Sequence, residues 1–298
     1  MVVTIPKDAS VRKISEILGE AGVLRDEALF GAISGPSLFR MQARFSGKAS
    51  RLRFGEYSIP AESSVDDILA LLSKGGNVFY QLTIPEGMTT AMALDRILDE
   101  ERLSGELTEV PAEGSLLPET YQYDSSTSRS QLIAQMRTAM TTALDEAWAA
   151  RDPSLPLKNK QEMLILASIV EKETRPNEHR KVASVFMNRL RQGWKLQTDP
   201  TVIYGITLGQ GSLGRGLRKS ELAAKTPYNT YVIEGLPPTP ISNPGRESLM
   251  AVANPETTEY MFFVADGTGG HAFAKTKAEH DRNVAAWRRI ERQRSQNQ

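Results

Sequence analysis

Residues 161–173 read Gln-Glu-Met-Leu-Ile-Leu-Ala-Ser-Ile-Val-Glu-Lys-Glu, and this stretch defines the interior of the protein. It is apolar almost all round through Val170, which is typical of a helix that is buried on most sides. Pro176 is expected to end the helix, because proline has no backbone N–H to continue it. We therefore expect a central buried helix whose last turn carries two carboxyl groups, Glu171 and Glu173.

Apolar positions with helical spacing lie on both sides of this central helix. One helix is predicted within Ser125–Lys160 and is ended by Pro153 and Pro156, and another is predicted over Asn177–Gln192 with Gly193 as its terminating residue. The Gly- and Pro-rich region from Trp194 to about Gly245 is expected to be ordered and functional, because aromatic and aliphatic residues are interspersed in it. A buried strand over 260–265 and a closing helix over 279–293 complete the predicted elements.

A strand–proline–cap–helix pattern occurs three times in the first hundred residues. In each copy an Ile-Pro pair ends a short strand, and a Ser or Thr then precedes an amphipathic helix. The pairs are Ile5-Pro6, Ile59-Pro60 and Ile84-Pro85, and the capping residues are Ser10, Ser64 and Thr89. Because the copies are unequally spaced, we interpret them as small β-α modules and not as a solenoid.

The charged residues balance overall but are unevenly distributed. Lys plus Arg and Asp plus Glu each number 36 in the 298 residues, which argues against a dedicated polyanion binder. Phe39–Phe54 contains five basic residues and no acid, whereas Gln81–Asp124 contains ten acids and two basic residues. This asymmetry predicts a domain boundary near residue 80. The basic segment is either a solvated face or a surface that meets an anionic polymer or lipid headgroups.

The residue composition excludes several classes of chemistry. Cysteine is absent, so disulfide scaffolds, thiolate metal sites and a cysteine nucleophile are excluded. With only three histidines (179, 271 and 280), we expect neither a metal site nor a cofactor, and we assign acid–base chemistry to a carboxylate. The longest apolar run, 163–170, is far below the roughly 20 residues of a membrane span. Either the protein stays in the cytoplasm, or an export or anchoring segment is missing from this chain.

The first candidate for that carboxylate is Glu171. Partial desolvation at the end of a buried helix, together with the helix dipole, would raise its pKa toward the range of a general acid. Glu173 lies about 200° around the helix and would have different surroundings. The alternative is that both are solvated carboxylates paired with nearby cations.

Three further groups of residues are candidates for binding or catalysis. Gln197, Thr198 and Asp199 precede a proline and offer three hydrogen-bonding side chains, or form a plain Asx turn. The pair Tyr228-Asn229 suits a sugar, or belongs to a turn with packed tyrosines. Glu113 and Glu119 form a carboxylate pair of the kind that glycoside hydrolysis uses. Residues 267–270 resemble a glycine loop but lack the P-loop lysine, and the G-x-S-x-G and H-E-x-x-H motifs are absent.

Eight segments in order resemble one family, the endolytic murein transglycosylases or YceG-like family, over about residues 80–290. They are LTIPEGMT (82–89), EGSLLPETY (113–121), LILASIVEKET (164–174), KVASVFMNRL (181–190), LQTDPTVIYG (196–205), TPYNTY (226–231), GLPPTPISNPG (235–245) and YMFFVADGTGGHAF (260–273). The first 80 residues resemble the family's LysM-like module. The resemblance implies an α+β fold with a LysM-like peptidoglycan-binding module at 1–80 and a catalytic domain at 81–298.

The resemblance also implies an activity: cleavage of the bond between N-acetylmuramic acid (MurNAc) and N-acetylglucosamine (GlcNAc), which leaves 1,6-anhydro ends and limits the length of nascent glycan strands. Glu171 would be the catalytic acid and base. The substrate-binding residues would be Glu119, Gln197, Thr198, Asp199, Tyr228 and Asn229. The open alternatives are a muramidase that uses water and a non-catalytic peptidoglycan-binding scaffold.

The resemblance further implies a bacterial inner-membrane protein with one N-terminal anchoring helix and its catalytic part in the periplasm. The present chain would then be a fragment that starts after the anchor. The expected partners are peptidoglycan strands and peptidoglycan synthases, without nucleic acid.

Overall fold

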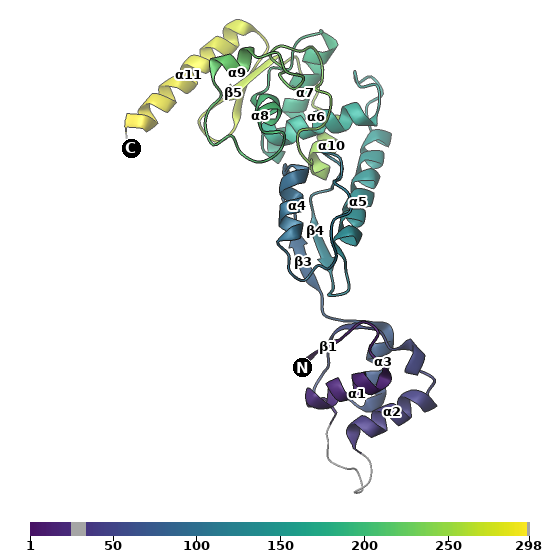
Figure 1. Ribbon diagram of the computed structural model, residues 1–298. Helices are drawn as coiled ribbons and strands as arrows, with labels where there is room; N and C mark the ends of the chain where they lie inside the picture. Colours follow the sequence, from purple (N-terminus) through teal and green to yellow (C-terminus); the bar gives the residue numbers. More distant parts are fainter. Residues whose placement is uncertain (25–33, 297–298) are drawn as a thin grey trace. The chain divides into compact units, whose positions relative to one another are not determined.

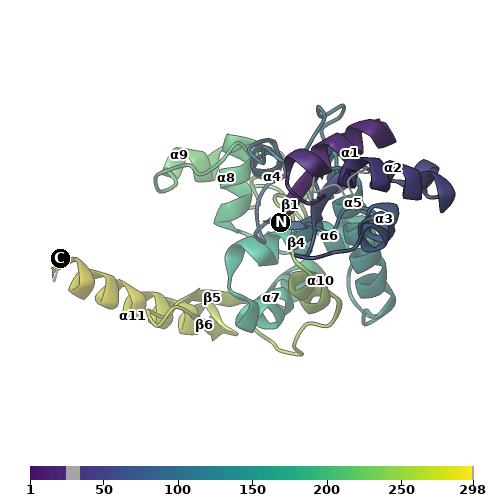
Figure 2. The ribbon, with the colours of Figure 1, turned by 90° about the horizontal axis from the view of Figure 1, so that it is seen from below.

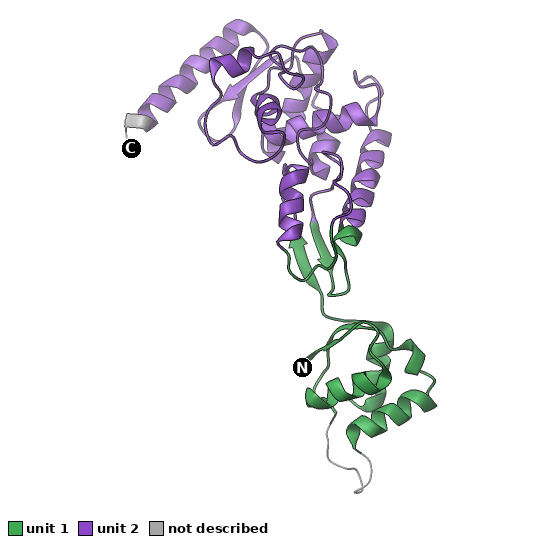
Figure 3. Cartoon of the chain, in the orientation of Figure 1, with its two compact units in different colours: residues 1–82, 100–106, 120–132 green, residues 83–99, 107–119, 133–298 purple. Residues whose placement is uncertain are grey.

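The computed structural model describes residues 1–24 and 34–296 of the chain (Figures 1 and 2). The fold is mixed α and β, as predicted, and the described residues form three two-stranded sheets, β1–β2, β3–β4 and β5–β6. Backbone contacts divide the chain into two compact units (Figure 3). The first unit comprises residues 1–82, 100–106 and 120–132, and the second comprises residues 83–99, 107–119 and 133–298. Two short segments beyond residue 100 therefore group with the N-terminal residues.

The elements up to residue 98 are β1 (Val2–Ile5), α1 (Val11–Glu20), α2 (Gly35–Phe45), the 3-10 helix η1 (Ala49–Arg51), β2 (Gly55–Ser58), α3 (Val65–Lys74), β3 (Tyr80–Thr83) and α4 (Thr90–Leu98). The elements that follow are β4 (Thr120–Tyr123), α5 (Arg129–Ala149), α6 (Lys160–Glu173), the 3-10 helix η2 (Pro176–Glu178), α7 (His179–Arg191), α8 (Asp199–Thr207), α9 (Lys219–Ala223), α10 (Arg246–Ala253), β5 (Phe262–Ala265), β6 (His271–Ala274) and α11 (Lys277–Gln296).

The three predicted strand–cap–helix copies are confirmed as β1–α1, β2–α3 and β3–α4. The Ser10 hydroxyl accepts a hydrogen bond from the backbone N of Lys13, and the Thr89 hydroxyl accepts one from that of Met92. At Ser64 the cap is reciprocal, because Asp67 also accepts from the Ser64 backbone N–H. Each cap satisfies an N–H group that would otherwise lack a partner, so the local sequence fixes where each helix begins.

The first unit has its own apolar core. β1 and β2 pair antiparallel, with Val3 opposite Tyr57. Val3 and Ile5 point into a cluster formed with the inner faces of α1, α2 and α3, which include Leu18 and Phe39. The sheet is only two strands wide, and packing against helices is what makes such a small sheet stable.

The core of the second unit is built around α6. All eight residues from Met163 to Val170 are buried, as the sequence predicts. Helices α7 and α10 pack against α6 and against each other, while β5, β6 and α11 pack together at one edge of the unit (Figure 2). Because α6 is enclosed through Val170, its last turn is where polar side chains emerge from the core.

Some predicted elements differ from the observed ones. Asp199 and Pro200 open helix α8 and do not form an isolated turn. The predicted buried strand at 260–265 is shorter, and β5 is half-buried on both faces. Residues 267–270 form the turn of a β5–β6 hairpin, in which Asp266 N donates to Gly270 O. The positive φ angles of Gly267 and Gly269 show that the glycines serve this turn.

Candidate active site

The carboxylate of Glu171 is bound by groups at the N-terminal end of α10. Its Oε2 accepts hydrogen bonds from the backbone N of Gly245 at 2.9 Å and from Oγ of Ser248 at 2.7 Å. Gly245 is the N-cap of α10, so the negative charge lies at the positive end of a helix. Glu171 therefore joins the end of α6 to the start of α10.

This arrangement continues through Ser248 to His179. Both side chains are buried, and Nδ1 of His179 lies 3.2 Å from the Ser248 hydroxyl. Nε2 of His179 lies 3.1 Å from the carbonyl oxygen of Thr174, which can only accept, so Nε2 carries the proton. The three side chains thus connect α10 with the segment that directly follows Glu173.

A second carboxylate, that of Glu86, lies beside the contact between Glu171 and Gly245. A Cβ atom built at Gly245 would come within 1.8 Å of Oε1 of Glu86, so Glu86 packs directly against the glycine. Burial raises the pKa of Glu86, and the charges of Glu171 and Glu247 raise it further. Three acidic residues therefore share this side of α6.

Glu173 has different surroundings, in agreement with its predicted position on the helix. Its side chain is half-buried. Desolvation raises the pKa of Glu173 to about 7, with a further contribution from the negative charge of Asp199. The Thr198 hydroxyl, His271 and Arg189 act in the opposite direction. A carboxyl group with a pKa near 7 can hold a proton at neutral pH and can also release it.

Two of the groups that act on Glu173, Thr198 and Asp199, lie at the start of α8. The hydroxyl of Tyr231 donates a 2.6 Å hydrogen bond to Asp199, and burial raises the pKa of this tyrosine. The Thr198 side chain is buried, and among the described residues its Oγ1 has no partner that meets hydrogen-bond geometry. This buried hydroxyl acts on Glu173, whose pKa it lowers.

Two of the predicted segments are held together by threonines. The backbone N of Thr198 donates to Oγ1 of Thr230 at 3.1 Å, and Oγ1 of Thr201 lies 2.8 Å from the same atom. Gln197 N donates to Thr230 O, and Gln197 adopts a positive φ of 51°. Left-handed backbone is costly for a residue other than glycine, and such strain is often found at functional sites.

The structure separates the roles of Tyr228 and Asn229. Asn229 is fully buried, and its amide nitrogen donates to the carbonyls of Glu221, Leu222 and Ala224. Its Oδ1 accepts from Tyr231 N. Tyr228 is half-buried, with its ring 5.0 Å from that of Tyr204 and its hydroxyl 2.7 Å from Oγ1 of Thr239. Asn229 therefore shapes the loop, and only Tyr228 retains an accessible surface.

The two carboxylates of the predicted 113–121 pair lie in different environments. Glu119 is exposed and forms an ion pair with Arg246, whose Nε lies 2.8 Å away. Because Arg246 follows Gly245, Glu119 belongs to the Glu171 side of α6. Burial raises the pKa of Glu113, which accepts hydrogen bonds from Thr90 N at 2.7 Å and from the Tyr204 hydroxyl at 3.2 Å.

Asn243 connects the segments that form this part of the unit. Its Oδ1 accepts from Leu116 N at 2.9 Å, its Nδ2 donates to Met88 O at 3.1 Å, and its backbone carbonyl accepts from Gly87 N. Two residues earlier, Ile241 N donates to Oγ of Ser168 in the middle of α6. The loop at 239–245 thus binds the 86–90 loop, the 113–119 loop and α6 into one structure.

Local patterns missed several residues of the site. Ser248, His179 and Tyr231 were not among the predicted site residues, and Glu173 was weighed only beside Glu171. The signal available for Tyr231 was its place in the segment TPYNTY, but Ser248 lies in an ordinary helical sequence. Within residues 1–24 and 34–296, no three His, Asp or Glu side chains are grouped so that they could hold a metal ion.

Comparisons with known proteins place this architecture in a family. The model of the YceG-like family matches residues 3–286, and the chain belongs to that family, as its motifs predicted. The Streptococcus pneumoniae serotype 2 protein named endolytic murein transglycosylase is 30% identical, over 96% of this chain and 58% of its own length. A Bacillus subtilis protein of the same name is 29% identical, over 94% of this chain and 82% of its own length.

A solved structure supports the same assignment. The crystal structure of a YceG-like protein of Listeria monocytogenes aligns with a TM-score of 0.57 at 29% identity, covering 95% of this chain and 98% of that one. The present chain spans 58% of the length of the pneumococcal relative. Among the described helices, none combines the length and the apolar character needed to cross a membrane.

Proposed function

We propose that this chain is a lytic transglycosylase that cleaves peptidoglycan glycan strands, with Glu173 as the acid and base of the reaction. The observation that carries the proposal is the raised pKa of Glu173, about 7, at the end of the buried helix α6. The family relatives named endolytic murein transglycosylase support the substrate class. Endolytic cutting, which would limit the length of nascent strands, is part of the proposal.

The sequence led us to expect Glu171 as the catalytic carboxylate, and the proposal replaces it by Glu173. Both hydrogen bonds to Oε2 of Glu171 come from groups of α10, which is the pattern of a structural anchor. A general acid must hold a proton near neutral pH, and desolvation favours the protonated form. Glu173 has the desolvated environment that the acid needs.

A single carboxyl group is sufficient for the chemistry. Protonated Glu173 gives its proton to the glycosidic oxygen between MurNAc and GlcNAc, and the bond from that oxygen to C1 of MurNAc breaks. The acetamido oxygen of the substrate stabilises the electron-poor C1, as in substrate-assisted glycosidases. The carboxylate then takes the proton of the MurNAc C6 hydroxyl, whose oxygen attacks C1. The product is a 1,6-anhydro sugar, the proton is back on Glu173, and no water is consumed.

The residues around Glu173 would hold the glycan. The exposed and strained residue Gln197 is a candidate for hydrogen bonds to the sugar, and Thr198 would act through the carboxyl group of Glu173. Asp199 would act on the pKa of Glu173, and Tyr228 would offer an apolar ring face. Asn229 and Glu119 are left out of this proposed set, because their polar groups are engaged with backbone and with Arg246.

The N-terminal unit would contribute binding. We propose that its first 80 residues act as a LysM-like peptidoglycan-binding module, which is consistent with their separate apolar core. An inner-membrane anchor that precedes this chain, a periplasmic location and association with peptidoglycan synthases belong to the same proposal.

Product analysis on purified glycan strands tests the proposal. The parent is expected to release anhydro ends, which are lighter by one water than the ends that a muramidase leaves. Glu173→Gln should reduce the cleavage rate by about 10² to 10⁴-fold, whereas Glu171→Gln should stay within about tenfold of the parent, because a glutamine oxygen can still accept from Gly245 and Ser248. Hydrated ends would indicate a muramidase, and strand binding without cleavage by the parent would indicate a scaffold. Loss of cleavage in Glu171→Gln alone would return the catalytic role to Glu171.

A further inference from the structure

The outward face of α2 is not explained by glycan cleavage. The helix buries Phe39 and Ala43 in the core of the first unit. The side chains on the opposite face include Met41, which is 41% exposed, and Phe45, which is 86% exposed. Removing apolar surface of this size from water would be favourable, so this face is suited to contact with a partner that is partly apolar.

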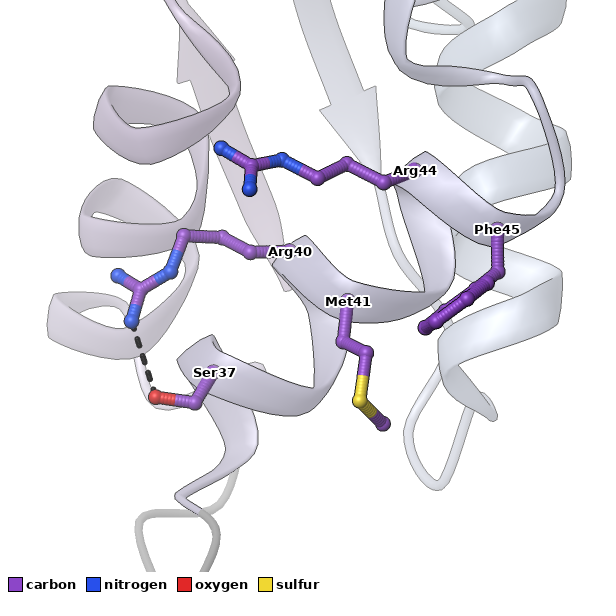
Figure 4. Close-up of a pocket in the computed structure, with 5 residues that line it drawn as sticks. All are labelled: Ser37, Arg40, Met41, Arg44 and Phe45. Carbon is purple, nitrogen blue, oxygen red and sulfur yellow. Dashed lines mark hydrogen bonds between the residues drawn. The ribbon is translucent and has the colours of Figure 1, made fainter.

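Basic side chains flank the two apolar ones. Figure 4 shows Arg40 and Arg44 extending on one side of α2 and Met41 and Phe45 on the other. These four residues and Ser37 line a surface hollow of about 560 Å³. The guanidinium of Arg40 donates to the hydroxyls of Ser37 at 2.9 Å and Ser15 at 3.4 Å. A row of positive charge therefore runs beside an apolar row.

The segment that contains α2 has a local excess of positive charge. Residues 39–54 contain five basic residues and no Asp or Glu. Among the described residues, no carboxylate lies within ion-pair distance of Arg44, Lys48 or Arg51. Exposed cations without counter-charges attract an anionic partner over a distance of about 10 Å at moderate salt.

We propose that this face of α2 docks on an anionic lipid surface. Met41 and Phe45 enter the boundary between headgroups and acyl chains, while Arg40 and Arg44 meet the phosphate groups. Basic residues combined with bulky apolar ones on one face are the pattern of helices that lie in a membrane interface. A soluble polyanion would use the charges but would gain little from an exposed phenylalanine, so the apolar row favours lipid.

Vesicle flotation with the full 298-residue chain tests this proposal. The parent is expected to bind vesicles that contain phosphatidylglycerol and not vesicles of phosphatidylcholine alone, and added salt should weaken the binding. Because each basic residue near such a surface contributes about fivefold in affinity, Arg40→Glu with Arg44→Glu should weaken binding at least about twentyfold. Met41→Ser with Phe45→Ser should also abolish most of it, because the apolar contact is lost.

Matched changes outside α2 serve as controls. Lys219→Glu with Lys225→Glu makes the same change in charge at exposed sites, and Val110→Ser with Leu98→Ser removes exposed apolar groups elsewhere. Both control pairs should bind like the parent, and all variants should keep the circular dichroism spectrum of the parent.

Equal loss in the control pairs, or no binding of the parent to anionic vesicles, would overturn the proposal. The proposal would also be overturned if the Met41 and Phe45 variant still bound the vesicles and soluble polyphosphate competed for that binding. That result would indicate a site for a soluble polyanion. Glycan cleavage by these variants is measured in parallel and its products are analysed, so that loss of vesicle binding is distinguished from loss of the proposed transglycosylase activity.

Discussion

The Ser248 hydroxyl donates a 2.7 Å hydrogen bond to Glu171, and this contact connects the first turn of α10 to the last turn of α6. Gly245 N donates to the same carboxylate oxygen. The end of α6 is thereby fixed two residues before Glu173, the residue that we propose as acid and base. An anchor and a reactive group thus occupy different faces of one helical turn.

The anchor can be tested by its effect on stability. Glu171→Ala removes the acceptor of both Gly245 N and Ser248 Oγ, and is expected to lower the free energy of unfolding by about 2–4 kcal/mol. Ser248→Ala leaves Glu171 with one donor and should cost about 1–2 kcal/mol. Urea unfolding measures both changes. The exposed Ser220→Ala is the control and should stay near the parent; equal stability of Glu171→Ala and the parent would contradict the anchoring role.

The raised pKa of Glu173 predicts that the parent is less stable at neutral pH than at acidic pH. The folded state holds this proton up to about pH 7, whereas the unfolded chain releases it near the ordinary value of 4.5. Parent stability should therefore fall as pH rises from 4.5 to 7, and the deficit should stay constant above that. Glu173→Gln, which cannot ionise, should be more stable than the parent by up to about 3 kcal/mol at pH about 8, and nearly equal to it at pH about 4.

Thermal unfolding of the two proteins across that pH range measures the difference. Glu171→Gln provides the matched comparison, because it removes a carboxylate from the same helical turn. If Glu173→Gln were less stable than the parent at pH about 8, the carboxyl group would be stabilised in its charged form and could not serve as the acid.

Much of the fold could be predicted from local sequence, because caps and apolar spacing act over a few residues. Ser10, Ser64 and Thr89 begin their helices where the pattern predicts, and the apolar run of α6 is buried as expected. β5 was predicted with the wrong bounds and burial, because it belongs to a two-stranded hairpin in which all four of its residues remain half-buried. Burial of a strand depends on what packs over it, which its own sequence does not contain.

The candidate site was less predictable, since its chemistry depends on distant segments. Position on the helix indicated that Glu171 and Glu173 differ, and the sequence led us to expect Glu171 to be the desolvated one, whereas desolvation raises the pKa of Glu173 in the structure. That choice depends on Thr198 and Asp199, which approach Glu173, and on Gly245 and Ser248, which approach Glu171 from more than 70 residues away in sequence. Tertiary contacts, and not spacing, decide which carboxyl group can hold a proton.

Asn243 is predicted to be essential for stability and to have no direct part in cleavage. Asn243→Ala would leave Leu116 N without its acceptor and would remove the amide donor to Met88 O, which keeps its bond from the backbone N of residue 243; the loss costs about 1–3 kcal/mol. Asn243→Asp keeps the acceptor for Leu116 N but loses the donor to Met88 O. Its free energy of unfolding should therefore lie between those of the parent and Asn243→Ala. Urea unfolding gives the order, and cleavage measured well below the unfolding transition should be close to that of the parent. A cleavage defect in a variant of full stability would instead place Asn243 in the reaction.

The pH profile of cleavage offers the sharpest test of Glu173, because its neighbours act on its pKa in opposite directions. Since the acid must be protonated, activity is expected to fall as pH rises through about 7. The negative charge of Asp199 raises this pKa, so Asp199→Asn should move the alkaline limb of kcat/KM to lower pH by about 0.5–1 unit. The Thr198 hydroxyl lowers the pKa, so Thr198→Val should move the limb to higher pH. A change that only loosened the fold would lower activity at every pH and leave the limb in place. Shifts in the same direction for both variants, or no shift in either, would show that the titrating group is not Glu173, and the same profiles on Glu171→Gln would then identify whether Glu171 sets the limb.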